Sequence, residues 1–256
     1  MPALNCRACD KYGPMASHGR CLGANMDRVA AERLILQRGW LSEQPEEARA
    51  AVLQRARLVK HDAGDFVFHA GDEAGGICGV VSGGIGIYLP TEPDGLRLAH
   101  IGRRGVWFGY GPLIRGRRRV LSFSPTETTW LLHVPLLALQ EIAAASLLHQ
   151  RAVLSVGEYG MDAAITIIEN LLVQNHARRI AGALLRVTPG IDEDPGHAAV
   201  EVILTQSQLG EMASVGRQVV NRELQRLQAR GWISVSYSRI MVLNRSALVM
   251  FAQGVT

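Results

Sequence analysis

Three of the chain's four cysteines crowd into its first 21 residues. Cys6 and Cys9 form a Cys-x2-Cys pair, and Cys21 follows them. The segment from 1 to 27 has little apolar periodicity, so something besides a hydrophobic core must order it, and a bound metal could do that. Four cysteines in a chain of 256 residues make a poor disulfide framework. The cysteine cluster therefore points to a metal or redox role.

A second group of polar residues belongs to two predicted helices near the C-terminus. Residues 205–208, Thr-Gln-Ser-Gln, fit a capping box, so the first helix begins near Gln206. That helix ends at residues 214–216, Ser-Val-Gly, and the second helix begins near Arg217. Two short helices separated by such a turn form a helix-turn-helix.

The second of these helices has an apolar stripe and an opposite polar face. The stripe consists of Val220, Leu224 and Leu227. The polar residues near its start are Arg217, Gln218, Asn221 and Arg222, with Ser214 in the preceding turn. The start of such a helix enters a DNA major groove, where Arg pairs with guanine and Gln or Asn with adenine. Residues 177–256 hold nine Arg against six acidic residues, an excess that suits phosphate binding. We therefore expect binding to double-stranded DNA, with a solvated face on an ordinary helical hairpin as the alternative.

Short apolar runs divided by glycine predict β-strands in two parts of the chain, residues 60–134 and residues 232–243. Residues 60–116 contain 14 of the 27 glycines, between runs at 66–68, 77–81, 85–89 and 96–101, and a further strand is expected over 128–134. Short strands with Gly-Asp and Gly-Gly turns argue for a small antiparallel barrel or jelly roll. Near the C-terminus, Gly231 ends the second helix, and residues 232–235 and 240–243 predict the hairpin of a wing.

The hydrophobic period changes after Pro135 and predicts helices. A seam of residues spaced by three and four runs through Val153, Val156, Gly160, Ala163, Ile167 and Leu171. The adjacent apolar pairs at 167–168 and 171–172 widen this stripe, as expected of a helix that packs on its own domain and on a partner at once. The pattern favours a homodimer, with a buried helix of a monomer as the alternative.

These elements predict an α+β protein with four parts. The expected boundaries are 1–27 for a Cys-bearing N-terminal arm, 28–146 for an antiparallel β jelly-roll sensor domain, 147–175 for a dimerisation helix and 176–256 for a winged helix-turn-helix. The chain has no run of 18 apolar residues and no secretory signal, so we expect a cytoplasmic protein without a membrane segment. No nucleophile–base pair, phosphate loop or carboxylate pair stands at a catalytic spacing, so we do not expect an enzyme.

Residues 55–250 resemble the CRP/FNR superfamily of transcription regulators. The strongest motif is residues 216–224, Gly-Arg-Gln-Val-Val-Asn-Arg-Glu-Leu, which is similar to the family's recognition helix; residues 68–72 and 80–83 resemble its cyclic-nucleotide-binding-like barrel signature. The resemblance implies a homodimer on a palindromic operator, with Arg217, Gln218 and Arg222 as base readers. It implies a contact with RNA polymerase if the protein is an activator. Gln218 stands where many members have Glu, so the half-site need not be the usual one.

The resemblance argues against two of the family's effectors. Members that bind cyclic nucleotides present Gly-Glu-Leu and then Arg-Ser/Thr-Ala, whereas this chain has Gly-Tyr-Gly at 109–111 and Arg-Val-Leu at 119–121. The ribose-binding carboxylate and the hydroxyl are therefore absent, and we do not expect cyclic AMP. Haem-dependent members place ligands in the same loop, where Gly109 and Gly111 have no side chain to offer.

The N-terminal cysteines resemble the arm of the family's oxygen-sensing members, which hold an iron-sulfur cluster. The gap before Cys21 is longer than in those members, and the fourth ligand is open between Cys78, His133 and His18. The same arm cysteines with His18 would alternatively make a tetrahedral Zn site. Thiol oxidation, a metal-free sensor that binds a small molecule, and a winged helix that mediates protein contacts are further alternatives. Cys78 also suits a buried strand position in the apolar run 77–81.

Overall fold

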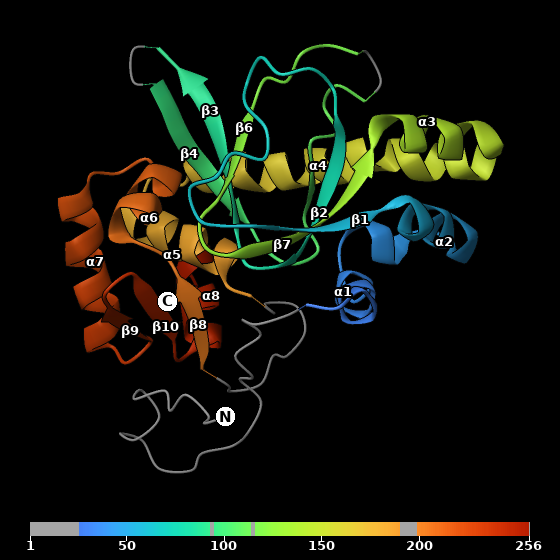
Figure 1. The fold of residues 1–256 in the computed structure, drawn as a ribbon. Helices are drawn as coiled ribbons and strands as arrows, with labels where there is room; N and C mark the ends of the chain where they lie inside the picture. The colour runs from blue at the N-terminus through green and yellow to red at the C-terminus, as the bar shows by residue number, and fades with distance from the viewer. Residues whose placement is uncertain (1–25, 93–94, 114–115, 190–198, 256) are drawn as a thin grey trace, which may run out of the picture.

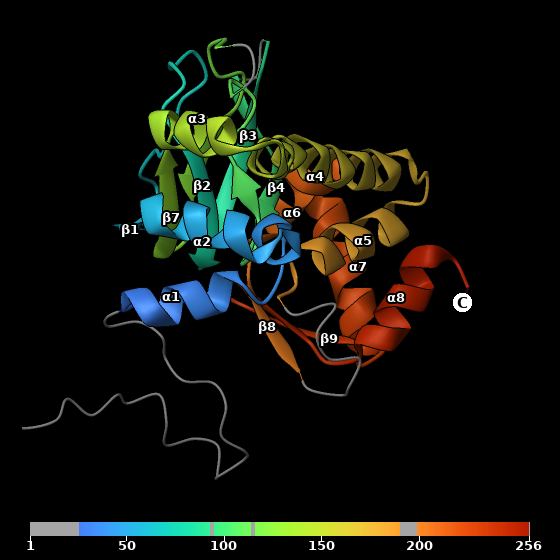
Figure 2. The ribbon, with the colours of Figure 1, turned by 90° about the vertical axis from the view of Figure 1, so that its right-hand side faces the viewer.

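A computed structural model describes residues 26–92, 95–113, 116–189 and 199–255. The described chain forms a β-sandwich with short helices at one side, a long helix α4 (Leu147–Leu172) along it, and a helical C-terminal domain (Figures 1 and 2). The α+β class, the jelly-roll-like sandwich, the long helix and the C-terminal helix-turn-helix are confirmed. None of the described helices combines the length and apolar character that a membrane span requires.

Two antiparallel sheets make the sandwich. One has the order β1-β7-β2-β5 and the other β4-β3-β6. The bounds are β1 Arg57–His61, β2 Gly76–Ser82, β3 Ile85–Thr91, β4 Gly95–Gly102, β5 Trp107–Phe108, β6 Ser122–Pro125 and β7 Thr129–Pro135. Alternate residues of β2 separate two cores: Cys78 and Val80 pack between the sheets, whereas Ile77 and Val81 pack on the helices outside. This alternation is what the pleat of a strand buried on both faces requires.

The helices outside the sandwich share one core with its first sheet. They are α1 (Arg28–Ile35), the 3-10 turn η1 (Trp40–Glu43), α2 (Glu46–Arg55) and α3 (Leu136–Ala145). Trp40 lies fully buried at the centre of this core and meets Trp107 of β5 edge to face, with 5.1 Å between the ring centroids. The Trp40 indole also donates to the carbonyl of Ala152, which ties η1 to the first turns of α4.

One expected strand is absent. Residues 66–68 form only an isolated bridge between Phe68 and Phe123. Two tight turns on either side explain the difference: Asp65 accepts from the amide of Asp62, and Asp72 accepts from the amide of His69. Asp side chains that bond to nearby amides compete with a strand ladder, so this stretch is a loop lying against β6.

The long helix α4 divides its apolar residues between two surfaces. Val153 and Val156 are buried in the core beneath the sandwich helices. A second stripe remains solvent-exposed and consists of Leu154, Met161, Ile165, Ile168 and Leu172. Its spacing of seven, four, three and four residues is that of a coiled-coil seam. The exposed stripe is therefore a face available to a second helix. Of the seam residues expected from the sequence, Val153 and Val156 are buried in the core, whereas Ala163 and Leu171 are exposed.

The C-terminal domain packs four helices on a small sheet. Its elements are α5 (His176–Val187), β8 (Val200–Ile203), α6 (Gln206–Ala213), α7 (Arg217–Ala229), β9 (Ile233–Ser236), β10 (Arg239–Val242) and α8 (Arg245–Gln253). The strand order is β8-β10-β9. Leu98 and Ile101 of β4 are buried in the same apolar core as these helices. The C-terminal domain and the sandwich thus share a packed junction.

Candidate nucleic-acid interface

The turn between α6 and α7 has the geometry that its sequence predicts. Thr205 accepts from the amide of Gln208 at 3.1 Å, and Gln208 accepts from the amide of Thr205 at 2.9 Å, so the capping box is confirmed. Ser214 ends α6 in the left-handed region at φ 50° and ψ 51°. Gly210 allows the backbone of the turn at Val215 to approach α6 closely, because a Cβ on residue 210 would lie 2.8 Å from the carbonyl oxygen of Val215. Helix α7 then starts at Arg217, as expected.

The structure brings the predicted base readers to one exposed surface. Arg217, Gln218, Asn221, Arg222 and Ser214 are all exposed, while Val220, Leu224 and Leu227 are buried. Helix α7 lies at the outer edge of the molecule (Figure 1). Gly216 caps it without a side-chain hydrogen bond, which leaves its first amides free to meet an anion. The surface can contact both phosphates and base edges of a duplex.

Three further residues of α7 were missed by sequence reasoning. Gln225 is exposed seven residues after Gln218, so helical spacing alone could have added it to the reading face. Glu223 is only 4% exposed and lies on the buried side of the helix. Its carboxylate accepts from Arg222 and from Arg226; the i,i+3 spacing of Glu223 and Arg226 could have indicated the second bond, whereas the bond to the adjacent Arg222 has no such signal.

The wing beside α7 has an exposed tip. Strands β9 and β10 pair in register from Ile233 opposite Val242 to Ser236 opposite Arg239. Tyr237 at the turn is 96% exposed, and Ser238 adopts a left-handed conformation with φ 55°. The hairpin expected from the sequence is present; its turn has two residues, where three were expected at 237–239, and both strand ranges are shifted by one residue.

One arginine of α5 connects the long helix to the helix-turn-helix. The Arg179 guanidinium donates to the carbonyl of Val173, where α4 ends, at 2.8 Å. It also donates to the carbonyl of Ala213 at 2.6 Å, at the end of α6. A displacement of the end of α4 would therefore act on the turn that orients α7.

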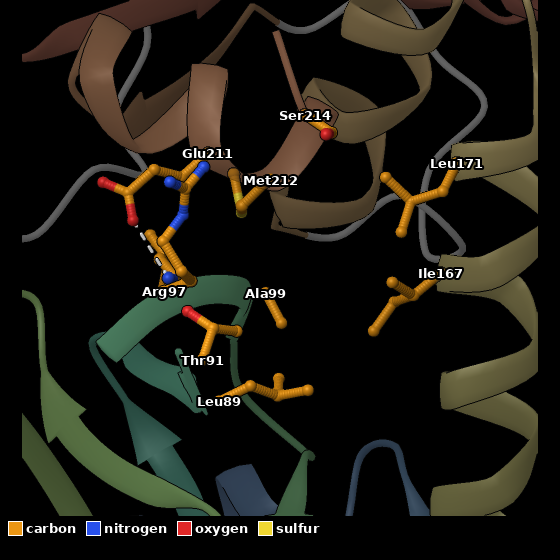
Figure 3. A pocket seen from close by; sticks show the side chains of 10 residues that line it. Leu89, Thr91, Arg97, Ala99, Ile167, Leu171, Glu211, Met212 and Ser214 are labelled. Carbon is orange, nitrogen blue, oxygen red and sulfur yellow. Dashed lines mark hydrogen bonds between the residues drawn. The ribbon is translucent and has the colours of Figure 1, made fainter. Parts of the chain in front are cut away.

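A groove marks the junction of the sandwich with the C-terminal domain (Figure 3). Its volume is about 320 Å³, and it lies between Leu89 and Ala99 of the β3–β4 ribbon, Ile167 and Leu171 of α4, and Met212 of α6. Glu211 of α6 accepts from the amide of Leu98 at 3.0 Å across its edge. The residues predicted as a seam at 167 and 171 thus face the protein's own junction.

The opposite side of this junction is held by basic residues. Arg103 donates to the carbonyls of Val187 and Ile203, at 3.2 and 2.8 Å, and pairs with Glu127. His100 lies beside Arg103 and Arg186. Burial, together with these two cations, lowers the pKa of His100 to about 3, so the buried imidazole is neutral at physiological pH.

The position that holds the phosphate in nucleotide-binding barrels is closed in this protein. Arg119 is 4% exposed and donates to the carbonyls of Gly109 and Gly76, at 2.9 and 3.0 Å. Its guanidinium carbon lies 3.4 Å from the centroid of the Phe68 ring. A Cβ at Gly109 would lie 2.9 Å from Arg119 Nη1. The two terminal amino groups of Arg119 are thus bonded to backbone carbonyls, whereas its buried Nε has no hydrogen-bond partner among the described residues.

Tyr110 stands in the place of the family's ribose-binding carboxylate and is turned away to α4. Its hydroxyl sits where a Cβ on Gly160 would lie, at 1.6 Å. Val120, in the place of the hydroxyl donor, is 72% exposed. The terminal amino groups of Arg119 are bonded to backbone carbonyls, and Tyr110 and Val120 replace the ribose-binding carboxylate and the hydroxyl donor, so the described residues do not present the groups with which the family holds a cyclic nucleotide.

The candidate metal ligands are only partly within the described residues. Cys6, Cys9, Cys21 and His18 lie outside them. Cys78 is buried in β2, directly opposite His133 of β7, and burial raises the pKa of its thiol to about 12. His133 Nε2 forms a hydrogen bond with the carbonyl oxygen of Gly75 at 3.2 Å. No group of three or more His, Cys, Asp or Glu side chains that could hold a metal is present in residues 26–92, 95–113, 116–189 and 199–255.

Two domain families match the chain. Residues 58–146 match the cyclic nucleotide-binding domain, and residues 178–251 match the Crp-like helix-turn-helix domain. No curated protein has a sequence that matches the chain.

Solved structures share the fold at low sequence identity. A Ruegeria pomeroyi protein assigned to cyclic nucleotide binding has 19% identity and a TM-score of 0.68, over 89% of this chain and 99% of that one. FixK2 from Bradyrhizobium japonicum has 18% identity and a TM-score of 0.64, over 76% and 96%. A transcriptional regulator of the CRP/FNR family from Thermus thermophilus has 20% identity and a TM-score of 0.59, over 77% and 98%. The chain thus carries a cyclic nucleotide-binding domain followed by a Crp-like helix-turn-helix domain, and it shares its fold with solved regulators of the CRP/FNR family.

Proposed function

We propose that the protein is a homodimeric regulator that binds a palindromic operator through α7. The observation that carries the proposal is the gathering of Arg217, Gln218, Asn221 and Arg222 on one exposed face of a helix at the molecular edge. Arg pairs bidentately with guanine, and Gln or Asn with adenine, so this face has the donors and acceptors for base readout. Ser214 and the uncapped start of α7 suit contacts with phosphates.

The exposed seam of α4 supports the dimer. Leu154, Met161, Ile165, Ile168 and Leu172 would be buried between two parallel copies of the helix. A dimer of this kind places two recognition helices about one turn of DNA apart, roughly 34 Å. A change in α4 packing would reach each recognition helix through Arg179.

Fluorescence anisotropy with labelled duplexes tests the function. Binding to an operator obtained from randomised DNA is expected to weaken steeply with salt, because Arg side chains displace condensed counterions. A scrambled duplex of the same length should bind at least roughly a thousandfold more weakly. Equal affinity for both duplexes would refute sequence-specific regulation and would favour a winged helix that serves protein contacts.

For the signal, we propose an oxygen- or redox-sensitive iron-sulfur cluster held by Cys6, Cys9 and Cys21. The Cys-x2-Cys spacing followed by a third cysteine supports the proposal. Cys78 is a poor fourth ligand in the described fold because it is buried between the two sheets of the sandwich. His133, opposite it on β7, is a second candidate through the ring nitrogen that does not bond to Gly75.

An anaerobic absorption spectrum with iron, sulfide and zinc analysis tests this signal. Broad absorption near 400 nm that air bleaches, with matching iron and sulfide, would support the cluster. Stoichiometric zinc in a colourless protein would instead support the tetrahedral Zn site, and a metal-free protein would leave thiol oxidation or a small molecule as the signal. If the protein is an activator, it would also contact RNA polymerase.

A further inference from the structure

Glu223 is a carboxylate at an apolar position of the recognition helix. The buried residues of α7 are Val220, Glu223, Leu224 and Leu227, at the spacing of the face that packs on the domain core. Only 4% of Glu223 is exposed. A carboxylate at such a position costs free energy unless it is paired, so its partners indicate its role.

Both partners are exposed arginines of the same helix. Glu223 Oε1 accepts from Arg222 Nε at 3.0 Å and from Arg226 Nη1 at 3.0 Å. Oε2 accepts from Arg226 Nη1 at 3.1 Å. The arginine side chains are 58% and 66% exposed, while that of Glu223 is 5% exposed. A fixed, buried anion therefore anchors two exposed cations.

Arg222 bonds to Glu223 through Nε and not through a terminal amino group. Glu223 uses Nε and leaves the two terminal amino groups of Arg222 for another acceptor pair. Guanine offers such a pair in the major groove, at O6 and N7. An arginine held in this way loses less side-chain freedom when it meets a base, because the guanidinium is oriented beforehand.

We propose that Glu223 is a positioning residue that sets operator specificity: it holds the Arg222 guanidinium so that its terminal amino groups face a guanine edge. The inference rests on the proposed function of α7 as the reading helix. Arg226 has a different role: its Nη1 donates to both oxygens of Glu223, and its exposed side chain is available to a phosphate.

The test compares the affinity for an operator, selected by the wild-type protein from randomised DNA, with that for a scrambled duplex. Glu223→Gln is expected to lower this ratio about tenfold, because a bidentate base contact discriminates by roughly 5- to 160-fold. The variant also removes a negative charge, so binding to the scrambled duplex should stay the same or become tighter. The ratio does not depend on the fraction of folded protein, so partial misfolding cannot imitate the result.

Two matched variants separate positioning from charge. Glu201→Gln makes the same charge change in the same domain, where Glu201 pairs with Arg239, and should leave the ratio unchanged. Arg226→Met keeps the bond between Glu223 and Arg222. It should lower the affinity for the operator and for the scrambled duplex by the same factor.

A double-mutant cycle gives the decisive comparison. In an Arg222→Ala background, Glu223→Gln should not change the ratio further, because the residue that Glu223 positions is gone. An undiminished tenfold loss in that background, or an unchanged ratio for Glu223→Gln alone, would overturn the inference. A wild-type protein that does not discriminate the two duplexes would instead refute the proposed function itself.

Discussion

Replacement of Arg103 by Met is expected to destabilise the junction between the sandwich and the C-terminal domain. The guanidinium is buried and bonds to the carbonyls of Val187 and Ile203, and it pairs with Glu127, whose side chain is 20% exposed. Met keeps the apolar stem, so the change removes mainly the charge and the hydrogen bonds. Breaking a buried pair by removing one partner costs roughly 3–5 kcal/mol. Because Glu127 retains some exposure, we expect the lower end, about 3 kcal/mol.

Urea unfolding followed by circular dichroism measures this loss. In a chain of this size, about 3 kcal/mol corresponds to a fall in Tm of roughly 10 °C. Arg117→Met is the matched control, because Arg117 is exposed, and its effect should stay within about 0.5 kcal/mol. Arg103→Met with Glu127→Gln should be less destabilised than the sum of the two single changes. A decrease in the free energy of unfolding below about 1 kcal/mol for Arg103→Met would show that this residue does not stabilise the junction between the sandwich and the C-terminal domain.

Three further changes test other parts of the structure. Ile168→Glu places a charge on the exposed seam of α4 and should convert the dimer to monomers in sedimentation equilibrium without lowering protomer helicity; a stable dimer would contradict the assigned seam. Gly79→Ala should cost about 2 kcal/mol in urea unfolding, because its Cβ would lie 2.6 Å from the buried Trp107 ring, and an unchanged midpoint would contradict that packing. The pKa of His100 is lowered from 6.5 to about 3, so the unfolded chain binds a proton more readily below pH 6.5 and stability is lost as pH falls toward 3. At pH 5 this loss is about 2 kcal/mol of the free energy of unfolding. Between pH 7.5 and pH 5 a His100→Leu variant should therefore lose about 2 kcal/mol less stability than the wild-type protein.

Local sequence signals were sufficient for the helix-turn-helix. The capping residues Thr205 and Gln208 bond to nearby amides, and the apolar period of α7 fixes which face is buried. The polar reading face follows from the same period. These features depend on contacts within a few residues, so the sequence alone could predict them.

Three other features were missed: two of them rest on local side-chain contacts that the apolar and polar pattern did not reveal, and the third depends on tertiary packing. Residues 66–68 have strand composition, yet the Asp side chains at 65 and 72 turn the chain into a loop. Glu223 would be taken as solvated from its charge, but two arginines of its own helix make burial tolerable. The sequence pattern placed Val153 and Val156 in a seam for a partner, because two apolar stripes run along α4 and only packing shows that these two residues face the core.

Sequencing of duplexes that the protein captures from randomised DNA decides whether α7 reads base sequence. The wild-type protein is expected to enrich an inverted repeat with half-site centres about 10 base pairs apart. Arg222→Ala should lose the enriched base positions in each half-site while retaining salt-dependent binding. The absence of any enriched repeat, or an identical repeat for Arg222→Ala, would contradict the assignment of α7 as the recognition helix.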